Sequence, residues 1–316
     1  MMNARSSIAV APGEGREQRT VTSRRRFRFR REYYGLLFVI PAMAFFLIFN
    51  IYPMFSGLYY SLTRFTLLKP PVFVGLDNFA KLLVDKQFQN AAFVTFAYVV
   101  GTTVPQWTLS LGLALLFRGH FRFKQVYKVL FFTPALLSGV VVSLVWKLLF
   151  DPRGLINVMA EPLAGTREIF WLGSSALAPY ALMIVANWAE FGYLMLIWLA
   201  GLVGIPREFY DAASIDGANR WQNFWHITLP LLKPTTVFVM VTTLIGAFQA
   251  FNLQYVMTEG GPRDSTTTMA LLVYKNGFQY FKMGEAAAIS VFMFLIIITI
   301  TILQVRLMRA EEVSYS

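Results

Sequence analysis

The stretch DAASIDGANRWQNFWHITLPLLKP, residues 211–234, decides how the chain folds because it separates two apolar segments. YALMIVANWAEFGYLMLIWLAGL (180–202) precedes it, and TTVFVMVTTLIGAF (235–248) follows it. The stretch itself holds two acids, a central glycine, two tryptophans and a histidine. Its pattern predicts a helix, a break and a second helix between two membrane spans.

The composition around this stretch is that of an integral membrane protein. Of 316 residues, 56% are hydrophobic and only 14% are charged, against about 25% charged in soluble domains. The apolar residues form continuous blocks of about 20 or more, which is the length a helix needs to cross a bilayer. The blocks lack the alternation of a membrane β-barrel. We therefore predict an all-α membrane protein.

Six spans are expected, with the polar hairpin between the fourth and the fifth. The expected spans are Tyr34–Leu62, Asn90–Phe117, Val129–Phe150, Ala178–Val203, Thr235–Thr258 and Glu285–Val305. We divide the chain into a basic tail (1–33), a transmembrane domain (34–308) that contains the loop 205–234, and a short C-terminal tail (309–316). About twice as many Lys and Arg residues lie on the side of both termini, which predicts that the termini and the hairpin are cytoplasmic.

Several functions have little support in the sequence. The net charge of +11 is concentrated in RRRFRFRR (24–31) beside the first span, which suits anionic lipid headgroups and needs no nucleic acid. The chain has no cysteine, and no glycine is followed by lysine, as a phosphate-binding loop requires. His120 and His226 are far apart. We expect no catalytic residue, no metal and no cofactor in this chain.

Local signals define the two helices of the hairpin. Pro206 suits a first helical turn, and Glu208 and Asp211 complement the dipole of that turn. Gly217 falls where a helix ends in a left-handed residue. The second helix, ANRWQNFWHI, is expected to end at Pro230. These signals fit both an interfacial hairpin anchored by tryptophan and a docking element for a cytosolic partner.

The spacing of the hairpin resembles a known family. Asp211-Ala212-Ala213, then Gly217, then Ile227, Leu229 and Pro230 resemble the EAA loop of permease subunits in binding-protein-dependent ABC importers. The family usually has Glu where this chain has Asp211. The resemblance implies a coupling helix that contacts an ATPase subunit. It assigns that contact to Asp211, Ala212, Ala213, Asp216, Gly217, Ile227, Leu229 and Pro230.

Two further segments, FVGLDNF (73–79) and EGGPRDST (259–266), resemble the carbohydrate branch of that family, which includes permeases for maltose, other oligosaccharides and glycerol-3-phosphate. The resemblance implies a bacterial inner-membrane subunit that is not itself an enzyme. The implied partners are a second homologous permease, two ATPase subunits that bind ATP and Mg²⁺, and an extracytoplasmic solute-binding protein. A sugar, or alternatively glycerol-3-phosphate or another polyol-type solute, is the expected cargo.

Polar residues at membrane depth mark where a solute could pass, because such groups usually face a cavity or the bundle interior. The candidates are Asn187, Trp188, Glu190 and Tyr193 in the fourth span and Gln249, Asn252 and Gln254 in the fifth. Amides, a carboxylate and aromatic rings suit sugars, but the same amides could equally join helices. The family resemblance favours the solute site. For Gln106 and Ser110 in the second span, helix joining is the favoured interpretation.

Two other functions compete with the permease subunit. A stand-alone secondary transporter would use Glu190 as its proton-coupling carboxylate. A membrane scaffold would use the hairpin to recruit a cytosolic protein without transport. The first leaves the hairpin spacing unexplained, and the second leaves the polar faces of the fourth and fifth spans without a role.

Overall fold

The computed structural model describes residues 32–119, 121–165 and 169–308, and most of them are helical. Nearly all of the expected basic tail and the whole of the expected C-terminal tail lie outside these residues. The chain divides into two units, residues 1–53 and 54–316, which are described separately.

In the first unit the described chain is helical. α1 (Glu32–Phe46) continues through a π-helical turn, η1 (Leu47–Ile51), into the start of α2 (Tyr52–Ser61). Pro41 lies inside α1, as membrane helices tolerate. Phe38–Ser61 is long and apolar enough to span a membrane.

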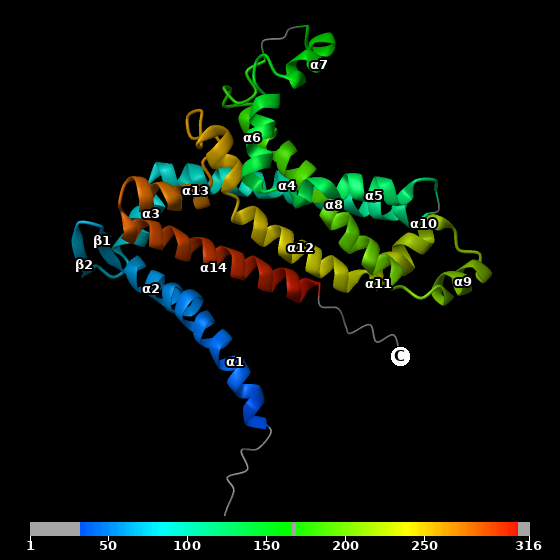
Figure 1. Ribbon diagram of the computed structural model, residues 1–316, viewed down its shortest axis with the longest axis horizontal. Helices are drawn as coiled ribbons and strands as arrows, with labels where there is room; N and C mark the ends of the chain where they lie inside the picture. The colour runs from blue at the N-terminus through cyan, green and yellow to red at the C-terminus, as the bar shows by residue number, and fades with distance from the viewer. Residues whose placement is uncertain (1–31, 120, 166–168, 309–316) are drawn as a thin grey trace, which may run out of the picture. The chain divides into compact units, whose positions relative to one another are not determined.

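Four helices form the framework of the second unit: α4 (Lys86–Arg118), α8 (Ala178–Val203), α12 (Lys233–Phe248) and α14 (Met283–Leu307). α4 packs along α8 and also contacts α12, and α12 packs against α14 (Figure 1). Tryptophans join these helices by hydrogen bonds: Trp198 Nε1 donates to Ser110 Oγ (3.0 Å), and Trp107 Nε1 donates to Thr243 Oγ1 (2.7 Å). Ser110 therefore joins helices, as the sequence favoured.

A small polar assembly lies at the start of the second unit. β1 (Thr63–Thr66) and β2 (Lys69–Phe73) form an antiparallel hairpin, followed by α3 (Asp77–Val84). The buried Asn78 donates from Nδ2 to the carbonyl oxygens of Ser61 and Thr63, both at 2.8 Å. A hydrogen bond from Lys81 lowers the pKa of the Asp77 carboxyl. Part of the FVGLDNF segment thus has a structural role.

The expected third span is not one straight helix. It consists of α5 (Lys124–Phe132), a 3₁₀ turn, η2 (Thr133–Leu136), and α6 (Gly139–Leu149), with a bend of 99° between the two arms. Pro134 has no N–H for an α-helical bond, and Ser138 begins a new helix by accepting a bond from Val140 N. The expected span Val129–Phe150 therefore contains a sharp bend in the structure.

The expected fifth span is also broken. α12 ends at Phe248, and a π-helical turn, η4 (Gln254–Thr258), follows after an irregular segment. Thr268 Oγ1 donates to the carbonyl oxygen of Ala250 in that segment (2.8 Å). A side chain distant in sequence thus replaces a helical partner. α13 (Met269–Tyr274) and η5 (Lys275–Gln279) come next.

The described residues contain four helices long enough to span, and the number rises to six only if each of two bent pairs counts as one. The first bent pair is the α5–α6 pair. The second joins Arg220–Leu231 to Lys233–Phe248 with a bend of 69°.

α7 (Leu155–Ala164) follows α6, and the short helices α9 (Glu208–Ile215), α10 (Arg220–Asn223) and α11 (Leu229–Leu231) lie between α8 and α12. Within the second unit, Figure 1 shows α9, α10 and α11 at one end of α8 and α12. It shows α3 and the β-hairpin near the N-terminal end of α14.

Candidate functional site

A cavity of about 440 Å³ with a mixed polar and apolar lining lies between α4, the α5–α6 bend, α8 and the end of α12. This volume is within the range of small-molecule sites, about 300–1,000 Å³. Its walls carry hydroxyls, amides, one carboxylate and aromatic rings. The polar and aromatic residues that line it are Tyr98, Thr102, Gln106, Glu190, Tyr193, Thr242, Thr243, Gln249, Phe251, Asn252 and Gln254.

Both helix breaks open onto this cavity. Leu137 and Gly139 line it at the α5–α6 bend, and Gln249, Ala250 and Phe251 line it after α12. Backbone groups without helical partners are tolerated at membrane depth where they face protein or a water-filled cavity. Discontinuous helices are also where membrane transporters build solute sites. The breaks that the sequence missed therefore shape the site.

α8 presents Glu190 and Tyr193 to the cavity. Tyr193 is 45% exposed and Glu190 is also exposed, although both lie well inside the helix. Gly192, between them in sequence, faces the α5 side. A Cβ at Gly192 would overlap the carbonyl oxygen of Phe131. Glycine thus lets α8 touch the α5 backbone while its neighbours face the cavity.

The segment after α12 supplies the three amides that the sequence singled out. Gln249 caps α12, and Asn252 lies against Gly139, where an added Cβ would be 3.1 Å from Asn252 Nδ2. Gln254 is 99% buried, and its side-chain amide interacts with the Tyr98 hydroxyl on the cavity wall. A buried amide beside a hydroxyl group is a polar feature of this wall that a solute or water can reach.

Asn187 and Trp188 do not line this cavity. Asn187 Nδ2 donates to the carbonyl oxygens of Gly101 in α4 (3.1 Å) and Met183 (2.8 Å), so it joins α4 to α8. Trp188 packs edge-on against Trp146 of α6, with ring centroids 5.2 Å apart. Their assignment to a solute site remains a prediction.

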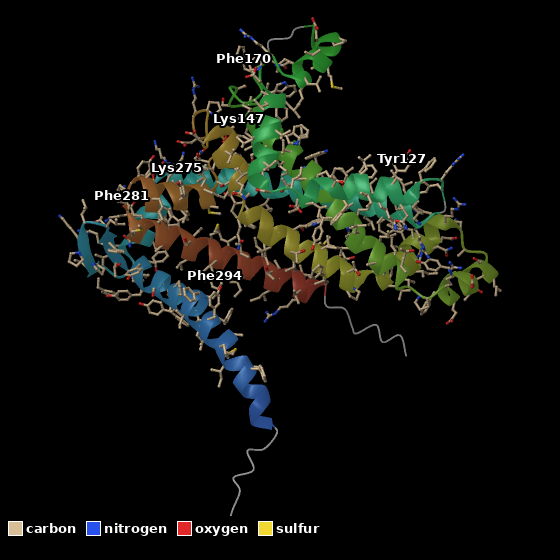
Figure 2. All side chains as sticks on the ribbon, viewed as in Figure 1. Tyr127, Lys147, Phe170, Lys275, Phe281 and Phe294 are labelled. Carbon is tan, nitrogen blue, oxygen red and sulfur yellow. The ribbon has the colours of Figure 1, made fainter. Side chains whose placement is uncertain are left out.

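Residues on α4 and on the first part of α12 complete the walls, and the sequence did not assign them to the solute site. Tyr98, Thr102 and Gln106 line the cavity at four-residue spacing along α4. That spacing was visible for Thr102 and Gln106 in the sequence, but it fits helix joining equally well. Lys147 of α6 (Figure 2) donates to the carbonyl oxygen of Val256 (3.1 Å), so it fastens α6 to η4 beyond the cavity.

The hairpin forms largely as its sequence predicts. α9 ends in a Schellman motif: Ala218 N donates to Ala213 O (2.9 Å), and Gly217 N donates to Ser214 O (3.2 Å). Gly217 has the expected left-handed conformation, with φ of +79°. Asn219 and Gln222 then form a reciprocal capping box at the start of α10.

The end of the second helix differs from the prediction. Helical backbone continues past Pro230 to Leu231. A π-helical turn, η3 (Phe224–Thr228), follows α10 and leads into the short α11. Pro230 occupies an early position of α11, where a missing N–H is tolerated.

The hairpin presents an exposed, partly apolar surface. No residue from Pro206 to Ile227 is buried. The exposed large apolar side chains are Phe209, Ile215, Trp221 and Trp225, with Ile215 88% exposed. Asp211, Ala212, Asp216 and Gly217 are exposed on α9 and at its end, whereas Ala213, Ile227 and Leu229 are partly buried and Pro230 is exposed.

Tyr210 anchors the hairpin to η3 and to the end of α4, a role that no pattern in the sequence indicated. Its hydroxyl lies 3.0 Å from Thr228 Oγ1, and the Arg118 guanidinium at the end of α4 lies 4.2 Å from its ring centroid. Tyr210 therefore links α9 to η3 and α4 by direct contacts.

Among the residues that the structure describes, no three His, Cys, Asp or Glu side chains come together as a metal site would require. The arrangement is suited to bind a polar solute without covalent chemistry. Fold and cavity thus define a multi-pass membrane protein with a solute-sized cavity that carries polar and aromatic side chains.

Comparison with known proteins specifies the class. Residues 106–311 match the family "Binding-protein-dependent transport system inner membrane component". A probable ABC transporter permease protein, YesP of Bacillus subtilis, is 35% identical, with 85% of this chain and 88% of YesP covered. The multiple sugar-binding transport system permease protein MsmF of Streptococcus mutans is 34% identical, with 89% of this chain and 97% of MsmF covered.

Among solved structures, a bacterial ABC transporter involved in the import of the acidic polysaccharide alginate has a chain of similar fold. Its TM-score is 0.78 at 22% identity, with 89% of this chain and 97% of that chain covered. The present chain belongs to the family of inner-membrane components of binding-protein-dependent transport systems. The family resemblance drawn from the sequence is confirmed.

Proposed function

We propose that this chain is a permease subunit of an ATP-driven importer and forms part of the pathway for a sugar or oligosaccharide. The observation that carries the proposal is the cavity of about 440 Å³, whose walls carry amide, hydroxyl and aromatic groups. It lies beside the middle of α8 and the C-terminal end of α12. Curated relatives with sugar-transport names, such as MsmF, support the substrate class.

The cavity walls suit a saccharide. Gln249, Asn252 and Gln254 offer amide donors and acceptors for hydroxyl groups. The rings of Tyr193 and Phe251 offer apolar faces for the C–H surface of a sugar ring. Since the cavity is open in the single chain, a second, homologous permease chain would complete it. Glycerol-3-phosphate or another polyol-type solute is the alternative cargo in the same machinery.

The hairpin is the proposed contact with the ATPase subunits. Its exposed side chains Phe209, Ile215 and Trp221 form a surface that a partner cleft could cover. Two ATPase subunits would bind ATP and Mg²⁺, and their closure would move α9. The Tyr210 contacts to Thr228 and Arg118 would then pass that movement to η3 and α4.

The orientation of the chain and the delivery of the solute complete the proposal, and they rest on the distribution of Lys and Arg residues and on the family. Both termini and the hairpin would face the cytoplasm of a bacterium. An extracytoplasmic solute-binding protein would deliver the solute to the opposite side. ATP-driven closure biases the permease pair between two states, so the cavity opens to one side at a time.

Uptake by the complete transporter tests this proposal. The complex is purified through a tag on this chain, its subunits are identified by mass spectrometry, and it is reconstituted with ATP and its binding protein. We expect an ATPase and a second permease in the complex, and ATP-dependent uptake of at least one labelled saccharide. Uptake driven by a proton gradient without an ATPase would instead support the secondary transporter.

Two variants separate solute contacts from helix joining. Gln249→Ala should raise the KM for the saccharide with little effect on thermal stability, because Gln249 is exposed to the cavity. Asn187→Ala should lower stability with little effect on KM, because Asn187 joins α8 to α4. If Gln249→Ala left KM and kcat unchanged, the cavity would not be the solute site.

A further inference from the structure

We propose that Glu190 is a specificity-determining residue that makes the pathway reject anionic solutes. Resting on the proposed function, this narrows the substrate to neutral or amine-bearing saccharides. Phosphorylated, sulfonated or uronic-acid sugars would be excluded.

Glu190 is the only Asp, Glu, Lys, Arg or His among the described residues that line the cavity. None of the ion pairs or hydrogen bonds found among the described residues involves its carboxylate. The side chain is exposed on the cavity wall. A lone carboxylate on the wall of a confined site acts on every charged solute that enters.

Helix dipoles do not offset this charge. The N-terminus of α6, at Gly139, faces the cavity and carries partial positive charge, but the Ser138 side chain already caps it. The C-terminus of α12, at Gln249, also faces the cavity and carries partial negative charge. The two helix ends therefore oppose each other, and Glu190 sets the sign of the charge that this chain contributes to the cavity.

A carboxylate favours neutral and amine-bearing saccharides. It accepts hydrogen bonds from sugar hydroxyls and attracts an ammonium group, whereas an anion has no cation in this wall to compensate it. The fold alone does not decide the charge of the solute, because the transporter of similar fold described above imports an acidic polysaccharide. The side chain at position 190 is the feature that decides it here.

The absence of cysteine from this chain allows a direct test that does not require knowledge of the solute. Gly246 of α12 lines the cavity, and a Cβ added there meets no atom within 4 Å. Gly246→Cys therefore places one thiol in the cavity of the complete transporter. Its rates of modification by a cationic trimethylammonium-ethyl and an anionic sulfonatoethyl methanethiosulfonate are followed by intact mass of this chain.

We expect the ratio of cationic to anionic rates to fall about tenfold when Glu190→Gln is added to Gly246→Cys. Glu190→Asp, which keeps the charge, should retain most of the ratio. A thiol at the exposed Leu68, between β1 and β2, serves as the control. Its ratio should not respond to Glu190→Gln. An unchanged ratio at Gly246→Cys in the Gln background would overturn the proposal.

Uptake then distinguishes this inference from the proposed function. In the reconstituted transporter, a neutral glycoside should compete with uptake better than the matched glucuronide, and Glu190→Gln should narrow the difference. If the thiol ratio shifts but no saccharide is taken up, the proposed substrate class fails and the charge filter stands. If saccharides are taken up and the glucuronide competes equally in the wild type, the charge filter fails and the proposed function stands.

Discussion

Replacement of Gly217 by valine should uncouple the transporter. Gly217 is the left-handed residue of the Schellman motif that ends α9, with φ of +79°. A side chain at this φ costs about 1–2 kcal/mol, and a β-branched one lies at the upper end. That cost lowers the population of the observed hairpin by about 5- to 30-fold relative to opened forms.

The structure separates this backbone effect from crowding. A Cβ added at Gly217 meets no atom within 4 Å, so valine has room within the chain itself. Gly217→Asn is the matched control, because asparagine adds a side chain of similar size but tolerates the left-handed region. The two variants thus differ mainly in the conformation they allow.

The assay is ATP hydrolysis by the purified transporter, stimulated by its solute-loaded binding protein. We expect Gly217→Val to reduce stimulation at least about fivefold and Gly217→Asn to stay within about twofold of wild type. Equal activity of all three proteins would refute the need for the left-handed turn. Equal loss in both variants, with the complex still assembled, would show that bulk at the ATPase contact matters rather than backbone conformation.

Three further substitutions test the packing that supports the site and the hairpin. Gly192→Ala should destabilise the protein by about 1–3 kcal/mol and so lower its thermal midpoint, since its Cβ would overlap the Phe131 carbonyl oxygen. Gly112→Ala is the control, because no atom lies within 4 Å of its Cβ, and equal midpoints in the two variants would contradict the close approach of α5 and α8. Tyr210→Phe removes the hydroxyl contact to Thr228, at a cost of about 0.5–1.5 kcal/mol, but keeps the ring beside Arg118. Stimulated ATP hydrolysis should therefore fall less in Tyr210→Phe than in Tyr210→Ala, and identical losses would show that the ring has no role. Asn78→Ala should lower the free energy of unfolding by about 1–3 kcal/mol, because two carbonyl oxygens lose their donor. Asn90→Ala, which removes one exposed hydrogen bond, is the control in thermal unfolding, and a greater loss of stability in Asn90→Ala would contradict this account.

Local patterns were sufficient for much of this protein. The span Ala178–Val203 has the bounds that apolar run length predicts, and the expected last span differs from α14 by two residues at each end. The turn at Gly217 also follows from short-range chemistry, because a helix end and a left-handed residue depend on few neighbours. The family followed from the spacing of the hairpin.

The solute site required the tertiary structure. Residues 129–150 and 235–258 are as apolar as a continuous helix needs, yet both segments break where the cavity lies. The second break is stabilised by a hydrogen bond from Thr268 to Ala250, which no local window contains. Likewise, nothing in the sequence around Asn187 and Glu190 shows that one faces α4 and the other the cavity.

The sequence by itself determined the membrane class, the positions of the long helices, the hairpin and the family, because hydrophobic run length and turn chemistry act over a few neighbouring residues. Only the tertiary structure decided which polar side chains face the cavity and where the spans bend. Those choices depend on which distant groups satisfy exposed backbone atoms, and on how closely glycines such as Gly192 let helices approach.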